Sequence, residues 1–152
     1  MNKISKKING DMKEAMKARD KERLSTLRML LSELKNAEIA ERGELSEEKE
    51  MQVLSSYARK LKESIAEFEK GDRDDLVAKE KKELEIVLSY LPKQLTEDEI
   101  SAEVEKVIAE VGAEGPGDVG SVMREMMKRF RGRVDGKVVN RLALDMLRKK
   151  GD

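Results

Sequence analysis

Residues 46–71 read SEEKEMQVLSSYARKLKESIAEFEKG, and this stretch decides the fold. Its apolar side chains recur at intervals of three and four residues, which is the spacing of one face of an α-helix. They are Met51, Leu54, Ala58, Leu61, Ile65 and Phe68. Ser46 is a typical N-cap and Gly71 a typical helix end. A helix with one apolar face needs other elements to cover that face, so the stretch predicts a packed helical protein.

The same helical periodicity continues on both sides of this stretch, and alternating strand patterns are almost absent. Helices are predicted at residues 3–18, 21–42 and 72–91. Pro92 ends the last of these, and the capping box of Thr96 and Glu99 begins the next helix. Two further helices are expected to follow, with Asp118 and Asp135 as their N-caps.

These elements predict an all-α fold with two domains that meet at Pro92. An N-terminal four-helix domain of long helices is expected over residues 1–92. A small C-terminal three-helix domain is expected over residues 93–152. Leu, Ala, Met, Glu and Lys dominate the composition, and all of them favour helices.

The composition excludes several classes of chemistry. The 152 residues include no Cys and no His, so disulfides, thiolate metal sites and every His-dependent catalytic triad are impossible. Glutamate pairs one helical turn apart, such as Glu63 with Glu67, are compatible with a carboxylate metal site. With 32 acidic residues in a helical chain, we interpret such pairs as solvated faces. We therefore predict no catalytic residue, no metal site and no cofactor.

The formal net charge is zero, but the charges are unevenly distributed. Residues 1–28 carry +5 and residues 119–152 carry +6, whereas residues 29–118 carry −11. One interpretation is a solvated surface with internal ion pairs. The other is that a basic end binds a polyanion.

The strongest candidate site lies around the turn between the last two predicted helices. Its cations would attract phosphates, and its glycine would allow a sugar–phosphate chain to approach the backbone. The candidate residues are Arg124, Lys128, Arg129, Arg131, Gly132, Arg133, Lys137 and Arg141. Phe130 is the one aromatic residue nearby, so base stacking is not expected. The alternative is a solvated basic face on which Gly132 only ends a helix.

Three other patterns are assigned structural roles. Met123, Met126 and Met127 share a helix face with apolar neighbours, so core packing is favoured over a partner groove. The glycine-rich stretch 112–120 lacks the Lys-Ser/Thr ending of a phosphate loop and is interpreted as a linker. The polar set in the N-terminal half fits either a binding groove between helices or an ion network that fixes helix packing, and the ion network is favoured. That set is Arg28, Lys35, Asn36, Glu38 and Arg73.

An ordered series of short motifs runs along the chain. The C-terminal part reads DVGSVM over 118–123 and RGRVDGKVVN over 131–140. Upstream motifs are DMKEAMK at 11–17, LRML at 27–30, KNAE at 35–38, KESI at 62–65, GDRDDL at 71–76 and YLP at 90–92. Each motif alone is weak, but the ordered series covers almost the whole chain and resembles the GatB/YqeY family.

The resemblance implies a stand-alone helical protein similar to the tail region of the B subunit of glutamine-dependent tRNA amidotransferase. That tail helps to hold tRNA, while the transamidation chemistry lies elsewhere. The family therefore carries an amidotransferase label, that of a carbon–nitrogen ligase with glutamine as amido-N-donor. This chain is too short to include the catalytic part, so we expect no enzyme activity of its own.

On this basis we expect an accessory protein of translation that binds tRNA or an RNA–protein complex. A protein partner in translation or tRNA amidation is also expected, and neither DNA nor a membrane is. The alternative is a helical protein–protein adaptor with no nucleic-acid role. No run of 18 apolar residues and no secretory signal are visible, so the simplest expectation is a cytoplasmic protein.

Overall fold

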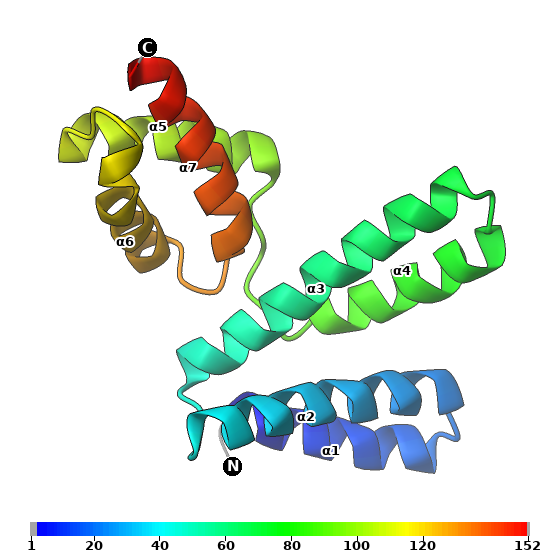
Figure 1. Ribbon diagram of the computed structural model, residues 1–152. Coiled ribbons are helices and arrows are strands. Elements are labelled where there is room, and N and C mark those ends of the chain that lie inside the picture. The colour runs from blue at the N-terminus through cyan, green and yellow to red at the C-terminus, as the bar shows by residue number, and fades with distance from the viewer. Residues whose placement is uncertain (1–2, 152) are drawn as a thin grey trace. The chain divides into compact units, whose positions relative to one another are not determined.

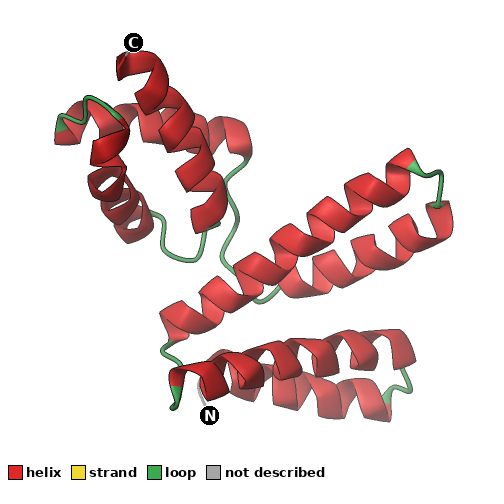
Figure 2. Cartoon of the chain, viewed as in Figure 1, coloured by secondary structure: helices red, strands yellow, loops and turns green. Residues whose placement is uncertain are grey.

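Seven α-helices and one short 3-10 turn make up the computed structural model, which describes residues 3–151. The elements are α1 (Lys3–Lys17), α2 (Lys21–Glu41), α3 (Glu47–Lys70), α4 (Asp74–Leu88), α5 (Glu97–Val111), η1 (Pro116–Asp118), α6 (Val119–Arg129) and α7 (Gly136–Gly151). Figures 1 and 2 show these helices joined by short loops, with no strand among the described residues. The all-α prediction is confirmed.

Contacts within the chain group into two compact units, Met1–Pro92 and Lys93–Asp152. Helices α1 to α4 lie in the first unit, and α5 to α7 lie in the second. Each unit has its own cluster of buried apolar side chains. The hydrophobic effect therefore acts on each unit through its own core.

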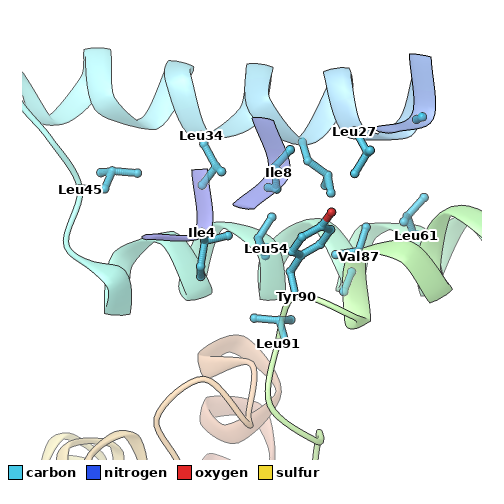
Figure 3. Packing of buried hydrophobic residues seen from close by; sticks show 13 residues of the cluster. Ile4, Ile8, Leu27, Leu34, Leu45, Leu54, Leu61, Val87, Tyr90 and Leu91 are labelled. Carbon is cyan, nitrogen blue, oxygen red and sulfur yellow. The ribbon is translucent and has the colours of Figure 1, made fainter. Parts of the chain in front are cut away.

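The core of the first unit draws at least one fully buried side chain from each of its four helices. Ile8, Leu27, Leu54 and Val87 all have zero exposed surface. Figure 3 shows them gathered between the helices from which they come. The apolar face of residues 51–68 thus contributes to this core through Leu54, Ala58 and Leu61, which are buried in it.

The core of the second unit is built mainly from valines and from long side chains of α6 and α7. Val104, Val122, Met126, Val139 and Leu147 are each fully buried. The partly buried Met123, Met127 and Phe130 pack against them. Core packing is confirmed for the methionine stretch, with Met126 at its centre.

Three of the predicted helix starts have the cap hydrogen bonds that local chemistry predicts. The backbone N–H groups of Arg23 and Lys49 donate to the side chains of Asp20 and Ser46, over 3.1 and 3.2 Å. At Thr96, both hydrogen bonds of the capping box with Glu99 are present. These caps satisfy N–H groups that a helix leaves without internal partners.

Three helices differ from the prediction at their ends. Helix α2 ends at Glu41, one residue before the predicted end, because Arg42 is left-handed (φ 60°). Helix α4 begins at Asp74 because Asp72 takes a left-handed turn (φ 55°), and it ends at Leu88. Asp118 makes no side-chain cap to α6, because its carboxylate accepts instead from the backbone N–H of Glu114 over 2.9 Å.

A buried carboxylate joins α3 to the start of α1. The side chain of Glu50 is 1% exposed. Its oxygens accept from the backbone N–H groups of Ile4 (3.4 Å) and Ser5 (3.1 Å) and from the Ser5 hydroxyl (2.5 Å). The negative charge thus lies at the positive end of the α1 dipole and satisfies its N–H groups.

Both tyrosines of the chain lie in the first unit and have raised pKa values. Burial, followed by the nearby charges of Glu83, Glu33 and Glu80, raises the pKa of Tyr57 to about 12. Burial and a hydrogen bond from its hydroxyl to Asp11 raise the pKa of Tyr90 above its ordinary range. Both hydroxyls therefore stay protonated in the folded protein at pH values where free tyrosine ionises.

We expect the first unit to lose stability as the pH rises above about 10. Unfolded tyrosine ionises near pH 10, so the unfolded state releases protons first and is favoured from that pH up to the folded pKa values. The stabilisation is complete below pH 10. Urea unfolding measured from about pH 8 to about pH 11 gives the free energy of unfolding at each pH. This free energy should fall more steeply with pH in the unsubstituted protein than in the Tyr57→Phe/Tyr90→Phe variant. Equal pH profiles would contradict this expectation.

Candidate nucleic-acid interface

The candidate cations lie on the hairpin formed by α6, the turn of residues 130–135, and α7. Gly132 has φ 75°, a conformation that residues with a Cβ rarely adopt, so glycine is favoured there. The N–H of Arg133 donates to the carbonyl of Phe130 over 2.9 Å and tightens the turn. At the start of α7, the Asp135 carboxylate accepts from the N–H of Lys137 over 3.0 Å.

Three hydrogen bonds fasten this turn to the segment that follows Pro92. The Gln94 side-chain amide donates to the carbonyl of Gly132 (2.7 Å), and the Arg133 guanidinium donates to the carbonyl of Lys93 (3.0 Å). The N–H of Leu95 donates to the carbonyl of Arg133 (3.0 Å). The structure therefore places Gly132 and Arg133 in an internal clasp. The sequence gives no signal for this clasp, because residues 93–95 resemble an ordinary linker.

Arg129 is held by two acids of its own unit. Its guanidinium donates to Glu125, one helical turn earlier, over 2.8 Å, and also to Glu110 at the end of α5. The hydrogen bond to Glu110, followed by that to Glu125, raises the pKa of Arg129 above its ordinary range. The charge of Arg129 is thus largely compensated within the protein.

Arg141 is held by one acid of its own unit. Its guanidinium forms an exposed ion pair with Glu97, in the first turn of α5. Two of the eight candidate residues are therefore paired with acids, and two more belong to the clasp. The free basic surface that the sequence suggested therefore contains fewer of the candidate residues.

Arg124, Lys128 and Lys137, here called the exposed hairpin cations, keep their charges open to solvent. All three are exposed, and no ion pair within the described chain involves them. Arg124 and Lys128 are one helical turn apart on α6. A Cβ at Gly136, the residue before Lys137, would lie 3.7 Å from the Met127 methyl group. The first turn of α7, which carries Lys137, therefore lies against the Met127 side chain of α6. Arg131, in the turn between them, is also exposed.

The glycine-rich loop is closed by the protein's own groups. The Lys150 ammonium donates to the carbonyl of Ala113 over 2.9 Å, and the Asp118 carboxylate accepts from the backbone N–H of Glu114. An anion would meet the Asp118 carboxylate there, so the interpretation as a linker is favoured over a phosphate cradle. Among the described residues, no group of three acidic side chains is placed to hold a metal ion.

The polar set of the N-terminal half is not brought together. Lys35 and Glu38 line a groove of about 340 Å³ with Ser5, whereas Asn36 lines another groove, between α2 and α3. Arg73 pairs with its neighbour Asp75. A larger groove of about 710 Å³ lies between the start of α2 and α4, and its lining carries both signs of charge.

Comparison with known proteins agrees with this architecture. The model of the YqeY-like protein family matches residues 5–147, nearly the whole chain. The chain belongs to this family. The motifs that suggested the resemblance all lie within the matched range, so that part of the sequence analysis is confirmed.

Several curated relatives of this YqeY-like chain carry the name altered inheritance of mitochondria protein 41, mitochondrial. The Saccharomyces cerevisiae protein is 40% identical over 85 residues, which are 55% of this chain and 46% of the relative. The Lachancea thermotolerans protein is 39% identical over 112 residues, 72% of this chain and 60% of the relative. The Kluyveromyces lactis protein is 33% identical over 136 residues, 87% and 69% respectively. The chain spans about half the length of the first of these relatives.

These names contradict the expectation of a cytoplasmic protein, because each relative is called mitochondrial. The expectation rested on the lack of a long apolar segment. That property is shared by water-soluble proteins of every compartment and does not distinguish between them. Among the described residues, no helix is long and apolar enough to cross a membrane.

Proposed function

We propose that this YqeY-like chain is an accessory RNA-binding protein that holds the backbone of a folded RNA of the tRNA class. The observation that carries the proposal is the set of exposed hairpin cations, Arg124, Lys128 and Lys137, which have no acidic partner within the described chain. Uncompensated cations gain most from a phosphate chain, because binding releases the counterions of the nucleic acid.

The surroundings of these cations favour contact with phosphates over reading of bases. Phe130 is half-buried and packs on the core of the second unit, so it offers little surface for stacking. The first N–H groups of α7 are partly used by Asp135. Folded RNAs are often bound through shape and backbone, which needs neither aromatic side chains nor a free helix end. The likeness to the amidotransferase tail supports tRNA as the class of RNA.

Binding to bulk tRNA should weaken in the Arg124→Gln/Lys128→Gln variant. Log affinity falls with log salt, and each lost phosphate contact makes this dependence shallower by about 1. The magnitude of the slope should therefore decrease by about 2, and the affinity at low salt should decrease roughly tenfold. The measurement is a salt titration of anisotropy with labelled bulk tRNA. Duplex DNA serves as the competitor.

The Arg129→Gln/Arg141→Gln variant is the matched control. It also removes two positive charges from the second unit, but these charges already have acidic partners. It should keep most of the affinity. Equal losses in the two variants would reduce the proposal to non-specific attraction. No tRNA binding at all, together with co-purification of a protein, would favour the adaptor alternative.

We also propose that residues 1–92 and 93–152 are separate folding domains. Each has a core of its own, which supports independent folding. A fragment of residues 93–152 should give a helical circular dichroism spectrum and a cooperative urea transition. Its midpoint should match one transition of the whole chain. A fragment without cooperative unfolding would contradict this proposal.

A further inference from the structure

The solvent face of α1 carries a row of lysines around a glycine. The row is Lys3, Lys6, Gly10, Lys13 and Lys17, all exposed. Spacings of three, four, three and four residues keep these positions on one side of the helix. At 1.5 Å per residue, the row is about 21 Å long.

The opposite face of α1 is fixed in the core of the first unit. Ile4, Ile8 and Ala15 are buried, and Figure 3 shows Ile4 and Ile8 among the core side chains. Glu50 holds the first turn through the hydrogen bonds described above. The row is therefore presented on a rigid helix whose apolar face is already used.

Few acids oppose these lysines. Helix α1 contains two, Asp11 and Glu14. Asp11 accepts from the Tyr90 hydroxyl, on the core side of the helix. Glu14 forms an exposed pair of 3.7 Å with Lys17. Lys6 and Lys13 have no ion pair in the described chain, so their charges remain uncompensated.

Helix α2 adds a second exposed row that contains no acid. Its members are Lys21, Ser25, Arg28, Ser32 and Lys35. The excess positive charge of residues 1–28 thus has a structural form. Six of the nine cations of residues 1–28 lie in these two exposed rows, on the two helices of one hairpin.

Gly10 is the feature that packing does not explain. It lies in the middle of α1, where glycine destabilises a helix relative to alanine. A Cβ at this position would meet nothing within 4 Å, and its φ is not left-handed. Neither a close contact nor an unusual backbone angle therefore requires glycine here. What glycine does provide is a shallow notch in which another chain can approach the helix backbone.

We propose that the outer face of α1, centred on Lys6, Gly10 and Lys13, is a second contact for the sugar–phosphate backbone of RNA. The choice of RNA as the polyanion rests on the proposed function, whereas the surface itself does not. A lipid bilayer fits less well, because the apolar face of α1 is buried and a flat headgroup layer has no use for a notch.

The test is a salt titration of bulk tRNA binding to the whole chain and to Lys6→Gln/Lys13→Gln. The magnitude of the slope of log affinity against log salt should decrease by about 2 in this variant. The matched control is Lys62→Gln/Lys79→Gln, which removes two exposed lysines from α3 and α4 and should leave the slope nearly unchanged. Equal slopes for the two double variants would overturn the inference.

Gly10→Leu separates a binding role from a structural one. Leucine favours the helix, so the midpoint of thermal unfolding should rise, while filling the notch should weaken tRNA binding several-fold. Unchanged binding would overturn the notch. Binding of the Lys6/Lys13 surface to vesicles with anionic phosphatidylserine, but not to tRNA, would overturn RNA as the ligand.

The two proposals fail in different ways. If only the exposed hairpin cations matter for tRNA binding, the inference about α1 is wrong and the proposed function stands. If only the α1 variants lose affinity, the proposed site on the α6–α7 hairpin is wrong and the α1 surface stands.

Discussion

Replacing Glu50 with alanine is expected to lower the free energy of unfolding of the first unit by about 2–4 kcal/mol. Two backbone N–H groups and the Ser5 hydroxyl would lose their acceptor in a place that water does not reach. Each buried donor left unsatisfied costs about 1–3 kcal/mol, and the favourable charge at the helix dipole is lost as well.

Urea unfolding followed by tyrosine fluorescence measures this loss, because Tyr57 and Tyr90 are the two tyrosines of the chain and both lie in the first unit. Glu47→Ala is the control. Glu47 is an exposed acid in the same first turn of α3, so its loss should cost no more than about 0.5 kcal/mol. Equal effects of the two substitutions would show that the Glu50 contact with α1 contributes little.

Glu50 also shows where prediction from the sequence ends. It belongs to the acidic first turn of α3, and a local reading assigns such acids to the helix dipole. Its partners are 45 and 46 residues away in the sequence, and no periodicity reports on them. By contrast, the caps at Ser46 and Thr96 were predictable because donor and acceptor lie three residues apart.

The candidate site, too, was predictable only in part from the sequence. The count of charges correctly located an excess of cations between residues 119 and 152, since this depends on composition alone. The count could not show that Arg129 is paired with Glu110 while Arg124 has no such partner, because Glu110 lies on another helix. Nor could it show that Arg133 reaches back to Lys93 across 40 residues. Only tertiary packing decides which cations remain available for an external anion.

Met126→Ala is expected to destabilise the second unit by about 2–5 kcal/mol, the usual range for truncating a buried methionine. Met126 has zero exposed surface and lies in the core that joins α5, α6 and α7. A compact unit as small as residues 93–152 has little stability to lose. The helix pair that carries the exposed hairpin cations should therefore unfold in part, and tRNA binding should weaken although no charge has changed.

Circular dichroism in a urea titration should show this as an early transition that tyrosine fluorescence does not follow, since neither tyrosine is in the second unit. Met127→Ala is the matched control, because Met127 is the next residue but is only partly buried. It should cost less than half as much. If the two alanine variants were equally stable, Met126 would not be at the centre of this core. If Met126→Ala unfolded both signals together, the two units would be one cooperative domain, because loss of packing in one would then remove the structure of the other.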